Sequence, residues 1–177
     1  NCSYLKKVTM KRLKMIHNDM FENCMQLVYI DMPQVTRIND HCFIGCHLLN
    51  NFTFPNVQTI GVSSFEGCLG ITNITLPSIE KIAKSCFQNC PNLIEINFPN
   101  CIFIDQEAFK DCIMLSKINL PNLAYIESGS FRNTNLMRIE LNSVIEINSK
   151  MFNGAFSKCS NLTHATMNTI QIVGANS

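Results

Sequence analysis

The residue types in this chain that could do chemistry are its ten cysteines and four histidines. Thiolates and imidazoles are ligands of zinc, and paired thiols form disulfides in oxidising compartments. Six of the cysteines recur every 22 residues and a seventh follows after a longer interval: Cys2, Cys24, Cys46, Cys68, Cys90, Cys112 and Cys159. A fixed interval of this length indicates stacked, near-identical structural units. We therefore expect small, buried, reduced thiols, with disulfides and metal binding as the alternatives.

The best candidate for a metal site is the segment His41-Cys42-Phe43-Ile44-Gly45-Cys46-His47. Two histidines and two cysteines suit a tetrahedral zinc ion. The same Cys-Phe-x-x-Cys spacing recurs at Cys86 and Cys90 with no histidine nearby, so the repeat explains the cysteines. The sequence predicts no metal site and no cofactor.

An enzyme would need a nucleophile, a base and an orienting acid that the fold brings together. The histidines fall at four different positions of the repeat, so stacking does not bring them together: His17, His41, His47 and His164. Asp105 and Glu107 are close in sequence, but both precede Phe109 in a segment that we expect to be a solvated turn. The sequence therefore predicts a non-enzymatic protein with no catalytic residues.

The repeat also predicts its own secondary structure. Each unit follows the pattern C-x-x-L-x-x-I-x-L-P-x-V-x-x-I-x-x-x-x-F-x-x. The alternation I-x-L is typical of a half-buried strand, and the proline after it ends that strand because it has no N–H to donate. V-x-x-I predicts a second short extended stretch. The spacing F-x-x-C predicts a single turn of α- or 3₁₀-helix.

The units divide residues 1–177, a single domain, as 2–23, 24–45, 46–67, 68–89, 90–111, 112–133, an irregular 134–158 and an incomplete 159–177. In the seventh unit Leu136 arrives one residue early, while Phe156 and Cys159 arrive about four residues late. We expect residues 148–155 to form a longer loop. Because the chain begins and ends within units, we expect it to be a piece of a longer array.

The pattern L-x-x-I-x-L-P…I…F-x-x-C, repeated about eight times, resembles the BspA-like leucine-rich repeat family. The resemblance implies an α/β repeat solenoid: a right-handed horseshoe with a parallel sheet on its concave face. Members of that family occur on bacterial surfaces and are expanded in protists, and they are generally adhesion or protein-binding modules. The glycine often found after the second isoleucine is present here only as Gly61.

The composition of the chain limits the classes of partner that we expect. The net charge of +1 gives no drive towards nucleic acid, and no apolar run is long enough to span a membrane. We expect a protein or cell-surface ligand, bound by an adhesion module or by an intracellular scaffold or regulatory subunit. The localisation stays open between cell surface and cytoplasm; ten free thiols in the native protein would favour the cytoplasm. Uncapped array ends could also pair with a second copy.

The residues that flank the core isoleucine of each first strand should point outwards, onto the predicted concave face. Their type changes from unit to unit, as expected of a surface that can be adapted to a partner. The first column is Lys7, Tyr29, Asn51, Asn73, Glu95, Lys117, Arg138 and His164. The second column is Thr9, Asp31, Thr53, Thr75, Asn97, Asn119, Glu140 and Thr166. A merely soluble sheet surface is the alternative.

A second candidate site is a local apolar patch on the second stretch, formed by Ile102, Phe103, Tyr125 and Ile145. Earlier units carry polar residues at these positions, and a local apolar stripe is typical of an interaction surface. Chance clustering, or cover by the loop of the seventh unit, would explain the patch equally well. Glycosylation triplets begin at Asn1, Asn51, Asn73 and Asn161; they do not establish secretion in a chain this rich in Asn, Ser and Thr.

Overall fold

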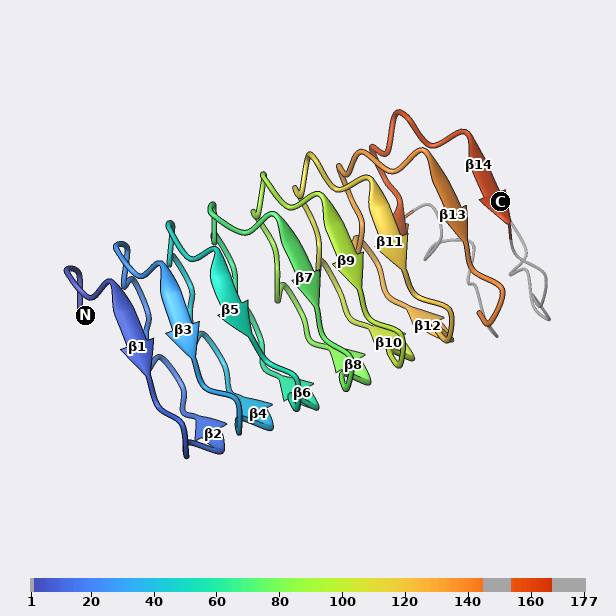
Figure 1. Cartoon of the computed structure of the whole chain (residues 1–177). Helices are drawn as coiled ribbons and strands as arrows, with labels where there is room; N and C mark the ends of the chain where they lie inside the picture. The colour runs from blue at the N-terminus through green and yellow to red at the C-terminus, as the bar shows by residue number, and fades with distance from the viewer. Residues whose placement is uncertain (1, 145–153, 167–177) are drawn as a thin grey trace.

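The computed structural model describes residues 2–144 and 154–166. The chain winds into a solenoid of about seven turns, in which every coil lies against the next (Figure 1). Each regular coil contributes a long strand of three residues, a short strand of two residues and a turn segment that leads into the next coil.

The long strands of the described residues are β1 (Lys7–Thr9), β3 (Tyr29–Asp31), β5 (Asn51–Thr53), β7 (Asn73–Thr75), β9 (Glu95–Asn97), β11 (Lys117–Asn119), β13 (Arg138–Glu140) and β14 (His164–Thr166). The short strands are β2 (Met15–Ile16), β4 (Arg37–Ile38), β6 (Thr59–Ile60), β8 (Lys81–Ile82), β10 (Phe103–Ile104) and β12 (Tyr125–Ile126).

All strand pairs are parallel and join equivalent positions of successive units, so that Val8 pairs with Ile30 and Ile74 with Ile96. The short strands form one sheet, β2-β4-β6-β8-β10-β12. The long strands lie in one row but form three sheets, β1-β3-β5, β7-β9-β11 and β13-β14 (Figure 1). The row of long strands is therefore interrupted twice, between β5 and β7 and between β11 and β13.

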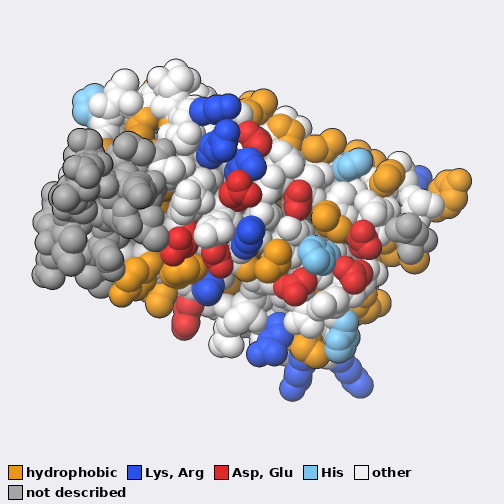
Figure 2. Space-filling view, turned by 180° about the vertical axis from the view of Figure 1, so that it is seen from behind, with side chains coloured by type: hydrophobic (Ala, Val, Ile, Leu, Met, Phe, Trp, Pro, Cys, Tyr) orange, Lys and Arg blue, Asp and Glu red, His pale blue; other side chains and the backbone are white. Residues whose placement is uncertain are grey.

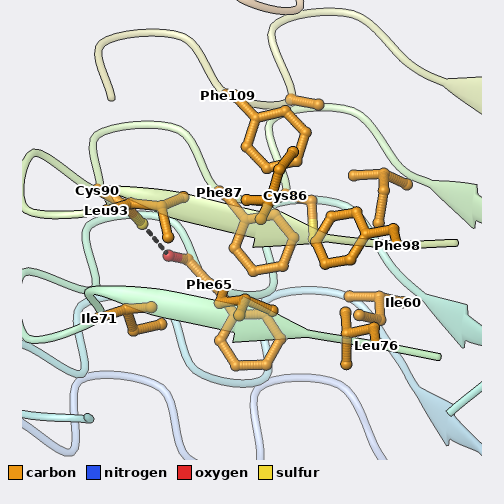
Figure 3. Close-up of a cluster of buried hydrophobic side chains, with 14 of the residues drawn as sticks. Ile60, Phe65, Ile71, Leu76, Cys86, Phe87, Cys90, Leu93, Phe98 and Phe109 are labelled. Atoms are coloured by element: carbon orange, nitrogen blue, oxygen red, sulfur yellow. Dashed lines mark hydrogen bonds between the residues drawn. The ribbon is translucent and has the colours of Figure 1, made fainter. Parts of the chain in front are cut away.

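The core contains a continuous stack of phenylalanine rings, one from each coil. Successive ring centroids lie 5.1–5.5 Å apart along Phe21, Phe43, Phe65, Phe87, Phe109, Phe131 and Phe156. Figure 3 shows three of these rings one above another, beside the leucine and isoleucine side chains of the strands. Because each ring packs on two neighbours, the stack couples every coil to the next.

Replacing Phe87 with alanine should lower the free energy of unfolding by about 3–5 kcal/mol, because it removes one ring from the middle of the stack. Urea denaturation followed by circular dichroism measures this loss. The matched control is Tyr125→Ala, which removes an exposed ring from a short strand and should cost less than about 1 kcal/mol. Similar losses for the two variants would show that the stack does not stabilise the array.

The predicted helical turn is wrong for the regular coils. The segments 18–23, 40–45, 62–67, 84–89, 106–111 and 128–133 form hydrogen-bonded turns. Each segment places two residues four positions apart at positive φ, for example Asp19 at 57° and Asn23 at 54°, or Ser85 at 52° and Asn89 at 57°. A right-handed helix needs negative φ at every residue, so these pairs exclude it.

The main-chain hydrogen bonds of the turn segments give the same result. Alternate N–H groups donate to the next coil, as from Phe43 to Ser64 O at 2.8 Å and from Phe65 to Cys86 O at 2.8 Å. The N–H groups between them close short turns within their own coil. The turns thus form a third ladder between coils, and the predicted α/β class is corrected to a solenoid of parallel strands. Within the described ranges, helical backbone is limited to Gly154 and Ala155.

Candidate functional site

The two predicted columns flank the central residues of the long strands, most of which are buried. On β7, for example, Ile74 is buried while Asn73 and Thr75 are exposed. Most members of the columns are exposed, and Tyr29, Asp31 and Asn97 are half-buried. The structure thus places the predicted residues along one side of the row of long strands, and we call this surface the strand face.

The charges at the N-terminal end of the strand face pair with one another. The ammonium group of Lys7 lies 4.4 Å from the ring centroid of Tyr29, which suits a cation–π contact. Lys11 forms a hydrogen-bonded ion pair with Asp31. The hydrogen bond to Asp31 is the main cause of a raised pKa for Lys11. The charged side chains at this end of the strand face therefore already have partners within the chain.

The middle of the strand face is polar. Asn119 Nδ2 donates to Asn97 Oδ1 at 2.7 Å, joining the side chains of two successive coils. Asn73 instead bonds to the Thr72 hydroxyl in its own coil, at 3.2 Å. The described asparagines of the strand face therefore form one amide pair, between Asn97 and Asn119 of the second column, and no continuous ladder.

The C-terminal part of the strand face contains the break between β11 and β13. In most coils the first residue of a long strand and the residue before it donate to the preceding coil, as Ser116 and Lys117 do to Ile94 O. In the seventh unit the donor is Asn135, which bonds to Leu115 O at 3.0 Å. The early arrival of Leu136 shortens the chain by one residue here, so β13 cannot continue the ladder of β11.

The break opens a pocket of about 310 Å³ on the strand face. Its lining comes from β11, β13 and the residues that follow them: Ile118, Asn119, Leu120, Pro121, Arg138, Ile139, Glu140 and Asn142. Ile118 is only half-buried, whereas the equivalent Ile96 of β9 is fully buried. The same difference marks Phe52 of β5, beside the other break. Arg138, Glu140 and Asn119 are thus brought together around an opening in the sheet.

The sequence did not predict this pocket. It identified Asn119, Arg138 and Glu140 as members of the outward columns, but it missed Leu120 and Asn142. The signal that could have found them is the early Leu136, since one missing residue must shift the register of a strand relative to its neighbour.

The apolar patch is present in part. Ile102 and Tyr125 are 46% and 43% exposed, and the rings of Phe103 and Tyr125 lie 6.4 Å apart. The ammonium group of Lys81 lies 4.2 Å above the ring of Phe103, which is half-buried. Ile102 also lines a wide, shallow groove with Gln58, Ser78, Glu80, Asn100 and Asn122. Ile145 lies outside the described residues.

The periodic cysteines are structural in the solenoid. The thiols of Cys46, Cys68, Cys90, Cys112 and Cys159 each donate to the main-chain oxygen of a phenylalanine in the preceding coil, at 3.0–3.2 Å. Figure 3 shows this bond from Cys90 to Phe65. Burial raises the pKa of the Cys46 thiol to about 12, which keeps it protonated as the bond requires.

The segment 41–47 does not assemble four ligands. The Cys42 thiol is buried and donates to the oxygens of His17 and Asn39, both at 3.1 Å. His41 is exposed, with Nδ1 3.5 Å from Asp19 Oδ1. Over the described ranges, no cluster of three or more histidine, cysteine, aspartate or glutamate side chains could hold a metal ion.

The two acidic residues considered for catalysis take part in ion pairs and turns. Glu107 Oε1 lies 2.8 Å from Lys110 Nζ, and Asp105 Oδ2 lies 3.9 Å from Lys81 Nζ. Asp105 Oδ1 also accepts a hydrogen bond from the N–H of Gln106 at 2.7 Å. Both side chains stabilise their turns. None of these contacts involves a histidine.

The face opposite the strand face mixes charges of both signs, with hydrophobic side chains along its upper edge (Figure 2). No helix within residues 2–144 and 154–166 is long and apolar enough to cross a membrane.

Comparison with known proteins supports the repeat pattern. The family model for the BspA type leucine rich repeat region, in six copies, matches residues 1–94 and 80–177. A leucine-rich repeat protein from Bacteroides ovatus superposes with a TM-score of 0.68 at 22% identity, over 95% of this chain and 56% of that one. The T. pallidum leucine-rich repeat protein superposes with a TM-score of 0.67 at 25% identity, over 73% of this chain and 65% of that one.

The chain thus spans less than two thirds of either solved relative, and comparison with curated proteins returns no match. The family model, by contrast, covers the chain from end to end, over the same repeats that build the coils. The chain belongs to the BspA-type leucine-rich repeat family.

Proposed function

We propose that this chain is a non-enzymatic module that binds another protein or a cell-surface ligand through its strand face, in an adhesion-type role. Leucine-rich repeat proteins typically mediate protein interactions and are generally non-enzymatic. The observation that carries the proposal is the contrast between the two sides of each long strand. The inward residues repeat almost unchanged, while the outward residues vary in charge and size and are mostly exposed.

The strand face is also where the surface is most adaptable. Its N-terminal charges are paired, its middle is neutral and polar, and its C-terminal part carries charged side chains around an opening in the sheet. Such a graded, rigid surface suits recognition of a folded or extended protein segment. This proposal includes the expectation that the strand face forms the concave wall of a right-handed horseshoe.

An intracellular scaffold or regulatory subunit is the second candidate, and it would use the same face. The hydrogen-bonded, buried thiol ladder favours it, because reduced thiols are the rule in the cytosol. The two candidates differ in compartment and partner, and not in the binding surface.

Reversing three charges on the strand face should weaken partner binding by at least about tenfold, because like charges then oppose the partner. The variant is Glu95→Lys, Lys117→Glu and Arg138→Glu. The measurement is affinity capture from cells that express the protein, followed by titration of the captured partner against wild type and variant.

A matched control changes the net charge by the same amount away from the strand face: Glu80→Lys, Lys84→Glu and Lys14→Glu, all of them exposed. This control should bind as wild type does. If the partner binds the strand-face variant normally but no longer binds the control, recognition takes place outside the strand face. A partner retained by both would mean that this segment acts as a spacer within an array.

A further inference from the structure

One hydrogen bond of the long-strand ladder is missing at the pocket. In four other coils the residue after a long strand donates to the last residue of the next long strand, as Phe98 N does to Asn119 O at 3.0 Å and Leu141 N to Thr166 O at 2.8 Å. The same bond is also absent between the described residues Met32 and Thr53 and between Phe54 and Thr75. The equivalent bond from Leu120 N to Glu140 O does not form between these two described residues. Both residues line the pocket, and Leu120 is only 4% exposed. The pocket therefore offers a main-chain donor and a main-chain acceptor.

The side chains add two further acceptors. Asn119 uses its Nδ2 to bond Asn97, which leaves its Oδ1 as an acceptor, and Asn119 lines the pocket. The next residue of that column is Glu140, whose carboxylate oxygens accept hydrogen bonds. Asn119 of β11 and Glu140 of β13 thus each contribute an acceptor to the lining of the pocket, one from either side of the break, and a ligand with two N–H donors can satisfy both.

Arg138 supplies the balancing donor. It lies two residues before Glu140 on β13, and both side chains are exposed and line the pocket. Within the part of the chain that the structure describes, no ion pair joins Arg138 to Glu140 or to another acidic group. The pocket therefore carries one positive and one negative group with no net charge.

We propose that this pocket binds a primary carboxamide, the side-chain amide of a glutamine or asparagine presented by the partner protein. The inference rests on the proposed function, since it names the chemistry that the strand face recognises. The amide oxygen accepts from Arg138 or from the N–H of Leu120, and the amide NH₂ donates to Asn119 Oδ1 and Glu140. In effect the ligand extends the Asn97–Asn119 amide pair by one more member.

Other groups fit this arrangement less well. A carboxylate would be repelled by Glu140 and has no donor for Asn119. An ammonium group would be repelled by Arg138 and leaves the N–H of Leu120 unpaired. The size of the pocket is at the lower end of the range for ligand sites, and β11 and β13 remain joined before their first residues by the bond from Asn135 to Leu115. A single side chain therefore fits better than a whole inserted strand.

The test is a titration of the ¹⁵N-labelled chain with N-acetyl-glutamine methylamide, monitored by nuclear magnetic resonance. We expect saturable shift changes at the main-chain amides of Leu120 and Glu140. The isosteric N-acetyl-glutamate methylamide should bind about fivefold more weakly or not at all, because it loses the NH₂ donor. Arg138→Ala and Glu140→Ala should each weaken the glutamine probe by about the same factor, while Glu95→Ala, on the same face outside the pocket, should not.

Equal binding of the glutamate and glutamine probes, or saturable shifts confined to residues outside the pocket, would overturn the inference. So would the absence of any saturable shift at probe concentrations up to 100 mM, which is well above the millimolar dissociation constant expected of one small polar group. Each of these outcomes would leave the proposed function standing if the strand-face charge variant still loses its partner, because that experiment does not depend on an amide.

Discussion

Replacing Ile74 with aspartate is expected to lower the free energy of unfolding by roughly 5 kcal/mol or more, while Asn73→Asp changes it by less than about 0.5 kcal/mol. The two residues are neighbours on β7, yet Ile74 is 2% exposed and Asn73 is exposed. Ile74→Asp removes buried methyl groups and leaves an unpaired carboxylate in the middle of the stack of coils. Asn73→Asp only adds a charge to the surface.

Urea denaturation at neutral pH, followed by circular dichroism, measures both losses against wild type. Because Ile74→Asp is expected to remove most of the stability of the array, Ile74→Val serves as a graded variant that still folds. It should cost about 0.5–1.5 kcal/mol. Equal losses for the two aspartate variants would show that the assignment of inward and outward residues on the long strands is wrong.

That assignment was available from the sequence because a strand alternates its side chains between two faces. The alternation I-x-L, repeated at a fixed interval, therefore predicts both the long strands and their buried side. The structure confirms a solenoid of stacked parallel strands, with residues such as Ile30, Ile74 and Ile96 at the same buried position. Repetition strengthens the prediction, since each unit is an independent instance of one pattern.

The turn segments were predicted wrongly because spacing alone does not specify backbone handedness. F-x-x-C suits a helical turn and an irregular turn equally well. The residue before the periodic cysteine, or before Thr134 in its place, carried the missing information: in the six regular turns it is Asn23, Gly45, Gly67, Asn89, Asp111 or Asn133, and each of these adopts positive φ. Lys158, before Cys159, also adopts positive φ but gives no such signal. Glycine, asparagine and aspartate are the residues that tolerate this conformation best. The other left-handed position gives a weaker signal, because only Asp19 and Gly129 are of these types and the remaining four are His41, Ser63, Ser85 and Glu107.

The outward columns followed from the same alternation, but the pocket did not. A pocket depends on how two coils diverge, and a single missing residue between Thr134 and Leu136 produces that divergence. The break between β5 and β7 has no comparable cause, because the interval between those strands is the regular 22 residues. We have no physical account of that second break.

Raising the pH above 9 is expected to destabilise the fold steeply, because most of the buried thiols resist ionisation. Burial raises the pKa of Cys42 and Cys46 from 9.0 to about 12 and that of Cys101 to about 11. Burial is also the main cause of the raised pKa of Cys24, Cys68, Cys86 and Cys112. Seven thiols therefore stay protonated in the folded chain at a pH where they ionise in the unfolded chain.

The sign of the effect follows from proton binding. Below pH 9 both states hold these protons, so the thiols contribute their full share to stability. Between pH 9 and about 11–12 the unfolded state releases protons that the folded state keeps, which favours unfolding. One such group changes stability by up to about 1.4 kcal/mol per pH unit, because the unfolded state then holds up to one proton fewer than the folded state. Cys42, Cys46 and Cys101 alone then remove up to about 4 kcal/mol per pH unit, until each folded-state pKa is reached.

Urea denaturation between pH 7.5 and pH 10.5, with a phosphine reductant present to prevent disulfide formation, measures this slope. Cys42→Ala removes one titrating thiol, so the free energy of unfolding should decline less steeply above pH 9 by the contribution of one thiol. This holds whatever stability the substitution costs at neutral pH. Ile74→Val is the matched control, since it lowers stability without removing a titrating group and should leave the slope unchanged. A free energy of unfolding that stays constant from pH 8 to pH 10.5 would contradict the buried, protonated thiol ladder, because a fold that holds neutral sulfur between its coils must lose stability where the unfolded chain can ionise it.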